Sequence, residues 1–346
     1  VGTVSRAFNN YPDIKPETRQ RILQVAKELG YSPTLSAKNL SSKKSSGMAL
    51  ILSQLLNEQV AGRDADGRVF MQRTTEDSSF LIMCGACRYA IERNLDMPVY
   101  VYSSELQNRK TYEQFCREHR LGGALLFGLQ TTDNYYKALS ESVLPCVTVD
   151  TRVSGENVGY VGTDNIASYR MLTEYLIDQG HREMLVLNGK KVATVCLERL
   201  AGVYEAYTAY GMEFRSENVL YTDFCEYEIE NLVTHYVGKY GKGRATAFLC
   251  MSDLIGVTVI RTLQKMGYSV PKDFSVVGYD GMACGRFVYP GLTTIDQNLE
   301  AKGYAAARLL SRMMNGDREN KEVLMPYQMV KRGSVAPPWN LEREAE

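Results

Sequence analysis

The sequence predicts an α/β protein with two parallel-sheet units behind a short helical N-terminal segment. A chain of 346 residues is too long for one compact core. From residue 48 onward, apolar runs typical of buried strands alternate with amphipathic helical stretches. Residues 1–46 differ from the rest, because they carry eight Lys and Arg against three Asp and Glu in a chain of net charge zero.

The composition is that of an ordinary globular protein, with 45% hydrophobic and 23% charged residues. No apolar run reaches the roughly 18 residues that a membrane span needs, and no signal peptide is recognisable. The eight Cys are scattered and mostly lie in apolar surroundings. This pattern favours reduced, buried thiols in a cytoplasmic protein without a membrane partner.

The basic N-terminal segment is predicted to form two short helices joined by a turn. In VGTVSRAFN, helical spacing would turn Val1, Val4 and Phe8 inward. In the second helix, Pro16 suits the first position and Gly30 suits the residue after the end. An apolar stripe runs along that helix and consists of Ile22, Val25, Ala26 and Leu29. The basic outer surface suits a polyanion, the alternative being a merely solvated face.

The remaining elements alternate in type, which predicts parallel sheets. The predicted strands are residues 48–56, 98–104, 123–129, 145–150, 183–189, 246–253 and 274–280. The predicted helices are residues 166–180, 200–211, 255–267 and 301–316.

Three of the predicted strands end in an aspartate: Asp150, Asp253 and Asp280. In open parallel sheets, ligands bind outside the carboxyl ends of the strands. Ionised carboxylates only accept hydrogen bonds, so they suit the hydroxyls of a sugar. The alternative for each Asp is a cap on the following helix.

The N-terminal motifs resemble the DNA-binding head and hinge of the lactose-repressor (LacI/GalR) family, in the order TVSRAFN, KPETRQRI, LGYSP and SAKNL. The resemblance continues through TDNIASYRMLTEYLIDQGHREM, ERLAGVYEAYTAYG, MSDLIGVTVIRTLQKMGYSVPKDFSVVGYDGM and PGLTTIDQ, which together cover nearly the whole chain. It implies a helix-turn-helix head, a hinge helix and two Rossmann-like subdomains that resemble a periplasmic sugar-binding protein and are joined by three crossing strands.

The resemblance also implies domain boundaries. The partial head spans 1–33, and the hinge helix and linker span 34–46. The N-terminal effector subdomain spans 47–161 and 298–322, and the C-terminal one spans 162–297 and 323–338. The family's first head helix has no counterpart before Val1. The sequence is therefore expected to be a fragment that begins inside the helix-turn-helix and binds its operator poorly.

For DNA recognition, Arg6 is the expected base reader, because Arg can hold guanine O6 and N7 bidentately. Val1 and Gly2 match the family's other base-reading positions. Leu40 matches the leucine that the family wedges into the minor groove. Thr3, Ser5 and Asn9 suit phosphate contacts, and Ala37 belongs to the hinge helix.

For effector binding, Arg199 matches the family's effector-binding Arg, for which a surface salt bridge is the alternative. The resemblance places six other residues at the cleft between the subdomains: Phe80, Asp150, Phe224, Asp253, Asp280 and Gln297. Either Phe could instead be ordinary core. Ser252 and Gly281 depart from the family's Asn and Asp. Residues 57–79 are an unusually long, charged insertion, expected to be a solvated surface loop or else to cover the cleft.

No catalytic constellation, cofactor site or metal site is recognisable in the sequence. Cys84 and Cys87 form a CxxC without a second zinc pair, so they are interpreted as structural thiols. His119, His181 and His235 form no ligand pair.

The prediction is therefore a ligand-controlled transcriptional regulator, of the repressor type, and not an enzyme. It would bind a near-palindromic double-stranded operator as a homodimer. A sugar is the favoured effector, with a nucleobase or nucleoside as the alternative. Two further classes of protein fit parts of the sequence less well: a solute-binding protein without a DNA role, and a sugar-modifying enzyme.

Overall fold

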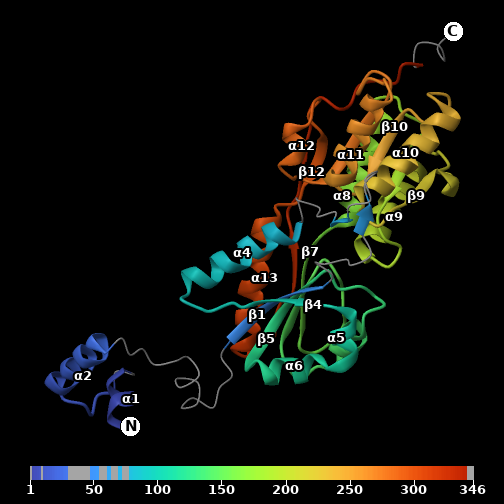
Figure 1. The fold of residues 1–346 in the computed structure, drawn as a ribbon. Coiled ribbons are helices and arrows are strands. Elements are labelled where there is room, and N and C mark those ends of the chain that lie inside the picture. Colours follow the sequence, from blue (N-terminus) through green and yellow to red (C-terminus); the bar gives the residue numbers. More distant parts are fainter. Residues whose placement is uncertain are drawn as a thin grey trace. The chain divides into compact units, whose positions relative to one another are not determined.

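The computed structural model describes residues 2–8, 11–29, 47–53, 61–63, 69–71 and 78–340 (Figure 1). The chain forms two compact units, residues 1–46 and 47–346. Within the described part of the chain, no helix is long and apolar enough to cross a membrane.

In the described part of the first unit, the chain forms two helices, α1 (Gly2–Phe8) and α2 (Pro16–Glu28). Ala7 and Ala26 are its buried apolar side chains, with exposed fractions of 2% and 7%. The expectation that Val4 faces inward is wrong, because this residue is 38% exposed. On the predicted stripe of α2, Val25 and Leu29 are exposed as well. Each short helix can bury only the side that faces its neighbour, and small alanines occupy that side.

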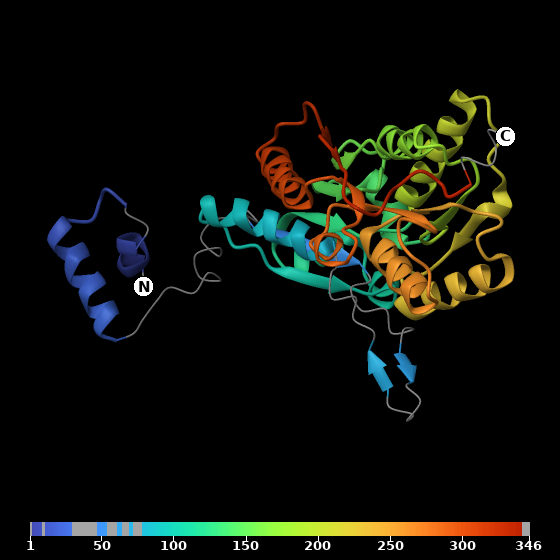
Figure 2. The ribbon, with the colours of Figure 1, turned by 90° about the horizontal axis from the view of Figure 1, so that it is seen from above.

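The residues that the structure describes in the second unit form two six-stranded sheets, which confirm the predicted parallel α/β class (Figures 1 and 2). The first sheet is entirely parallel, in the order β13 (Glu322–Met325), β7 (Val158–Thr163), β6 (Cys146–Val149), β5 (Leu121–Phe127), β1 (Gly47–Ser53) and β4 (Val99–Tyr102). The second has the order β14 (Gln328–Val330), β12 (Thr293–Asp296), β11 (Ser275–Asp280), β10 (Ala247–Cys250), β8 (Met184–Asn188) and β9 (Val219–Tyr221). Within this second sheet, β14 is antiparallel to β12 and the other described strands pair in parallel.

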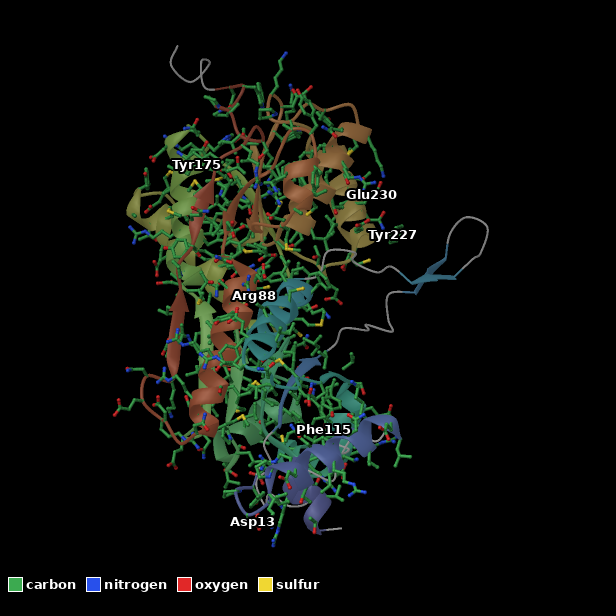
Figure 3. The ribbon with its side chains drawn as sticks, turned by 90° about the vertical axis from the view of Figure 1, so that its left-hand side faces the viewer. Asp13, Arg88, Phe115, Tyr175, Tyr227 and Glu230 are labelled. Carbon is green, nitrogen blue, oxygen red and sulfur yellow. The ribbon has the colours of Figure 1, made fainter. Side chains whose placement is uncertain are left out.

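Helices cover both sheets, and each sheet with its helices forms one subdomain. The first subdomain has α4 (Ser78–Glu92), α5 (Ser104–Arg109), α6 (Tyr112–Glu118), α7 (Asn134–Ala138) and α13 (Leu299–Met314). The second has α8 (Asn165–Asp178), α9 (Thr194–Ala209), α10 (Glu226–Tyr240), α11 (Asp253–Lys265) and α12 (Cys284–Phe287). Phe115 lies in the core of the first subdomain, and Tyr227 lies exposed on α10 of the second (Figure 3).

The four predicted helices end at glycines. Gly180, Gly211, Gly267 and Gly316 follow α8, α9, α11 and α13, and each has a positive φ. Glycine adopts this conformation without the steric cost that a Cβ would add, so it ends a helix readily.

The expected subdomain boundaries at 161/162 and 322/323 fall inside β7 and β13. Pairing between these strands in the first sheet continues to Thr163 and Met325. The chain therefore crosses to the second subdomain a few residues later than expected. In the insertion at 57–79, the structure describes an antiparallel pair, β2 (Ala61–Arg63) and β3 (Val69–Met71), and the start of α4. Whether the insertion covers the cleft lies outside the described residues.

Candidate functional site

Two carboxylates lie at carboxyl ends of strands, one in each subdomain. Asp150 directly follows β6, and Asp280 is the last residue of β11. Their φ angles are +61° and +115°, in a region that non-glycine residues rarely adopt. Such backbone strain tends to accumulate at functional sites. Both side chains keep some contact with solvent, with exposed fractions of 14% and 13%.

Lys302 and Gln297 connect the two carboxylates. Lys302 comes from α13 and is completely buried. Its Nζ donates to Oδ1 of Asp150 at 2.7 Å and also to Oε1 of Gln297. In turn, Nε2 of Gln297 donates to Oδ1 of Asp280 at 2.7 Å. An unbroken chain of hydrogen bonds therefore runs from the first subdomain to the second through the segment that joins β12 to α13.

Arg199 completes this arrangement from α9. Its side chain is 6% exposed, which excludes the surface salt bridge considered from the sequence. Nε donates to Oδ1 of Asn165 at 3.0 Å, and Nη1 donates to the carbonyl oxygen of Met251. Cζ lies 3.7 Å from the centroid of the Tyr279 ring, a cation–π contact. Nη2 lies 3.8 Å from Oδ1 of Asp280. We refer to Asp150, Lys302, Gln297, Asp280 and Arg199 as the cleft network.

Opposing effects determine the ionisation of Asp280. Burial raises its pKa to about 6, while Arg199, Lys302 and the hydrogen bond from Gln297 act in the opposite direction. Asp150 also raises this pKa, because it is a second negative charge nearby. Asp280 is therefore mostly ionised at neutral pH and takes up a proton just below it.

Asp253 does not join the cleft network, contrary to the expectation from the sequence. Its exposed fraction is 0%. Its Oδ2 accepts from the backbone N–H of Met282 at 2.6 Å, and its Oδ1 accepts from the hydroxyl of Thr294. Both oxygens are thus used to hold β12 and the segment after β11. The side chain of Ser252 caps α11, by accepting from the N–H of Ile255.

The two predicted aromatic residues have different surroundings. Phe224 lies in the loop between β9 and α10 and is partly buried. Its ring covers Gly189, where an added Cβ would come within 2.1 Å of Cζ. Gly189 directly follows β8, so Phe224 lies at the carboxyl ends of the second sheet. Phe80 lies in the first turn of α4 and is 59% exposed.

Two further contacts join the subdomains near the cleft network. The hydroxyl of Thr194, at the start of α9, donates to the carbonyl oxygen of Asp150 at 3.3 Å. The hydroxyl of Thr131 donates to the carbonyl oxygen of Val192. Neither contact nor Lys302 was foreseen. One feature of the sequence could have indicated Lys302. It is a single lysine on the face of the predicted helix 301–316 that otherwise carries small and apolar side chains.

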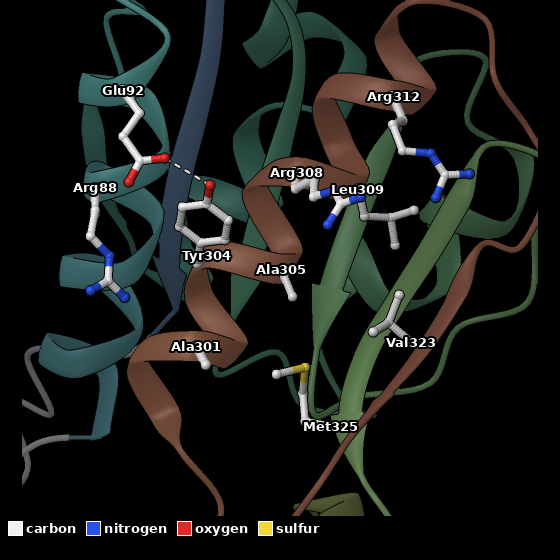
Figure 4. A pocket seen from close by; sticks show the side chains of 10 residues that line it. All are labelled: Arg88, Glu92, Ala301, Tyr304, Ala305, Arg308, Leu309, Arg312, Val323 and Met325. Carbon is white, nitrogen blue, oxygen red and sulfur yellow. Dashed lines mark hydrogen bonds between the residues drawn. The ribbon is translucent and has the colours of Figure 1, made fainter.

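A separate pocket of about 650 Å³ lies against α4, α13 and β13 (Figure 4). It is lined by Arg88, Glu92, Ala301, Tyr304, Ala305, Arg308, Leu309, Arg312, Val323 and Met325. No residue of the cleft network belongs to it. Arg88 pairs with Glu300 at 3.0 Å and Arg312 pairs with Asp317 at 2.8 Å, so much of its positive charge is already neutralised. The pocket is therefore not the candidate effector site.

In the first unit, Gly2, Thr3 and Arg6 are exposed on α1. Nη1 of Arg6 lies 3.0 Å from Oδ2 of Asp13. Exposed ion pairs of this kind contribute little, so a DNA base could displace Asp13. The other predicted DNA contacts lie outside the described residues: Val1, Asn9, Ala37, Leu40 and the side chain of Ser5.

The CxxC cysteines, Cys84 and Cys87, are partly buried in α4. Among the residues that the structure describes, no group of three or more His, Cys, Asp and Glu could hold a metal ion.

Comparison with known proteins gives matches over both units. Residues 1–34 match the model of bacterial regulatory proteins of the lacI family, and residues 173–335 match that of a periplasmic binding protein-like domain. The HTH-type transcriptional regulator CelR of Thermobifida fusca is 30% identical over 91% of this chain and 88% of its own length. The regulator MalR of Clostridium butyricum is 27% identical over 96% of this chain and 95% of its own.

Solved structures give the same result. A complex of the transcriptional regulator CelR with cellobiose has a TM-score of 0.71 at 27% identity and covers 96% of this chain and 95% of its own. A lac repressor dimer bound to operator and the anti-inducer ONPF has a TM-score of 0.80 at 21% identity, which supports the fold, and covers 97% of this chain and 95% of its own. These relatives are transcriptional regulators and not enzymes. This chain therefore belongs to the LacI family and is a DNA-binding transcriptional regulator.

Proposed function

We propose that this regulator binds a sugar between its two subdomains and that the sugar controls its binding to a near-palindromic operator in the cytoplasm. The observation that carries the proposal is the cleft network. It brings two carboxylates and a buried arginine together at the carboxyl ends of strands from both sheets. Hydroxyls are the natural partners of such acceptors. The similarity to a regulator solved with cellobiose supports a sugar over a nucleobase.

The coupling to DNA follows from the position of the network. Because Asp150 and Asp280 belong to different subdomains, a sugar that contacts both stabilises one arrangement of the subdomains over others. An effector changes DNA affinity only through such differential binding. The same linkage requires operator DNA to change the affinity for the sugar by an equal factor.

A thermal-shift screen of the whole chain tests the sugar site. The compounds are cellobiose, other sugars, sugar phosphates, nucleosides and nucleobases. A compound at 100 times its dissociation constant should stabilise the fold by roughly 2.7 kcal/mol. We expect a sugar to give a shift that Arg199→Ala removes. Arg170→Ala is the matched control, because Arg170 forms an exposed ion pair with Glu174 on α8. Stabilisation by a nucleoside alone, or a shift that survives Arg199→Ala, would contradict the proposal.

The operator contact is proposed for α1, with Arg6 as the base-reading side chain. Its side chain is 59% exposed and, among the residues that the structure describes, forms an ion pair with Asp13, which is 52% exposed. Selection of binding sites from random duplexes should return near-palindromic sequences. Arg6→Ala should relax the preference at one base pair by about 1–3 kcal/mol. An unchanged preference would exclude Arg6 as the reader.

A homodimer is proposed on the side of the second unit that carries α4 and α12. Phe287 and Tyr289 are 84% and 87% exposed there, and Ile91 on α4 is 75% exposed. The segment that contains Met282 and Cys284 packs into the same core cluster as α4, so this segment and α4 are neighbours in the fold. Figures 1 and 2 both place α4 and α12 on one side. Large exposed apolar groups of this kind mark interaction surfaces.

Sedimentation velocity tests the dimer. The unmodified chain should sediment as a dimer, and Phe287→Asp with Tyr289→Asp should give a folded monomer. Val143→Asp is the control. Val143 is also an exposed apolar residue, at 65%, but it lies in a loop of the first subdomain and not beside α12. A monomeric unmodified chain, or a dimer unaffected by the double substitution, would contradict the assignment of this surface.

A further inference from the structure

The cleft network also limits the charge of the effector. We propose that Lys302 is a positioning residue that holds Asp150 as a hydrogen-bond acceptor, so that the site takes an uncharged, hydroxyl-rich sugar and excludes its phosphorylated forms. This inference rests on the sugar site proposed above and adds the chemical class of the sugar.

The two positive charges of the network lie behind the two negative ones. The side chains of Lys302 and Arg199 are 0% and 6% exposed, against 14% and 13% for Asp150 and Asp280. Each cation is also directed to protein atoms, Lys302 to Asp150 and Gln297, and Arg199 mainly to backbone and amide oxygens. The charged atoms that a ligand meets are therefore carboxylate oxygens.

The hydrogen bonds leave one oxygen of each carboxylate available. Oδ1 of Asp150 accepts from Lys302, and Oδ1 of Asp280 accepts from Gln297 and lies near Arg199. The Oδ2 atoms of both have no partner among the residues that the structure describes. Since an ionised carboxylate only accepts, a ligand that displaces water from these two oxygens must donate hydrogen bonds to them. Sugar hydroxyls supply donors, whereas a phosphate adds negative charge and only acceptors, which repel these oxygens.

Lys302 acts through Asp150 and not by direct contact with the ligand, because it is completely buried. A buried ammonium group is tolerated only where it is paired and hydrogen-bonded. The charged groups that act on it are Asp150 after β6, Asp280 on β11 and Arg199 on α9. Lys302 also lowers the pKa of Asp280, so without Lys302 the Asp280 carboxylate would keep Arg199 as its remaining cation and would take up a proton more readily.

Isothermal titration of the whole chain with matched pairs of sugars tests the selection. The probes are glucose, galactose and the disaccharide that gives the largest shift in the thermal screen, each beside its 6-phosphate. We expect at least one neutral sugar to bind and its phosphate to bind at least about 100-fold more weakly. Equal or tighter binding of a phosphate would overturn this inference while leaving a sugar site in place. No binding by any member would overturn the sugar proposal itself, and this inference with it.

Substitution of Lys302 tests the positioning role. Lys302→Met should weaken the neutral sugar about 10-fold or more at pH 7.5 and move the pH midpoint of binding upward, which a purely structural defect would not do. The double variant Lys302→Met with Asp150→Asn loses both charges, so the protein should fold normally. The ratio of its affinities for the neutral sugar and for the sugar phosphate should fall at least about 10-fold. Lys265→Met is the control, because Lys265 forms an exposed ion pair with Glu230. An unchanged pH midpoint and an unchanged ratio of the two affinities would overturn the role of Lys302.

Discussion

At the scale of single residues, the cleft network combines charged groups, each of which would destabilise the fold if it were buried alone. Asp280 shows this most directly, because burial raises its pKa to about 6 even with Arg199 and Lys302 nearby. A folded-state pKa above the unfolded value of 3.8 means that the folded protein holds this proton more tightly. Stability therefore falls as the pH rises from about 4 to 6, and the cost is fully present above pH 6.

Asp280→Asn should remove that cost. We expect the variant to be more stable than the unmodified chain at pH 8 by roughly 1–3 kcal/mol, with a smaller difference at pH 4. It should also lose sugar affinity, a trade between stability and function that is common at binding sites. Urea unfolding at the two pH values measures the effect. A variant that is less stable at pH 8 would show that the charge of Asp280 contributes net stabilisation.

Asp253 provides a contrasting case at the same scale. Its carboxylate accepts from Met282 and Thr294 with no exposure to solvent. Asp253→Ala should therefore lower the free energy of unfolding by roughly 2–4 kcal/mol, because a buried N–H and a buried hydroxyl lose their partner. Sugar affinity, corrected for the unfolded fraction, should stay within about twofold. A large loss of affinity in a well-folded variant would restore Asp253 as a ligand residue.

At the scale of elements, close packing of α4 against α13 shapes the first subdomain. An added Cβ at Gly85 would lie 1.8 Å from the carbonyl oxygen of Glu300, and one at Gly303 would lie 1.9 Å from that of Ile82. The two helices thus approach backbone to backbone, and side chains at these positions would force them apart. Because α13 carries Lys302, this contact also sets the position of the cleft network.

Gly85→Ala should therefore destabilise the fold by roughly 2–4 kcal/mol and weaken sugar binding. Gly238→Ala on α10 is the matched control, because no other described part of the protein comes within 4 Å of its added Cβ, apart from the neighbouring backbone of α10 itself. That substitution should be stabilising by about 0.5–1 kcal/mol, since alanine favours a helix over glycine. Thermal unfolding compares the two variants. Equal effects would mean that the α4–α13 contact is not tight in solution.

The arrangement of helices and strands also explains which residues of the cleft network could be predicted from the sequence. The sequence predicted Asp150, Asp280 and Arg199 because strand ends converge in parallel sheets and because the family motifs align with them, and the structure joins all three in the cleft network. Asp253 satisfied the same strand-end rule, yet Met282 and Thr294, about 30 and 40 residues later, use both of its oxygens. Local sequence does not reveal such distant partners. Likewise, the inward face of α1 could not be predicted, because it depends on where α2 packs.

At the scale of the whole molecule, a buried histidine ties the C-terminal segment to the second subdomain. Nε2 of His181 lies 3.0 Å from the carbonyl oxygen of Ala336, which can only accept, so Nε2 carries the proton. Nδ1 then accepts from the hydroxyl of Thr246 at 2.8 Å. Burial lowers the pKa of His181 to about 4, with a smaller contribution from Arg182.

Acid should weaken the fold through this histidine. Its folded pKa of about 4 lies below the unfolded value of 6.5, so the unfolded chain binds more protons between these limits. The contribution of neutral His181 to the free energy of unfolding is fully present above pH 6.5. It should decline by up to roughly 3 kcal/mol as the pH falls towards 4. His181→Asn should be less stable at pH 7 but should lack this part of the decline. Urea unfolding from pH 7 to 4.5 gives the comparison, and parallel curves for the two proteins would exclude His181 as the cause.

The account of the whole molecule depends on one claim, that a sugar contacts Asp150 and Asp280 from the two subdomains at once. The most direct measurement is isothermal titration of the best sugar from the screen into the unmodified chain, Asp150→Asn and Asp280→Asn at pH 7.5. Each substitution should weaken binding about 10-fold or more, because a charged acceptor is lost on one side of the cleft. If both variants bind the sugar as tightly as the unmodified chain, the effector site lies elsewhere in the protein.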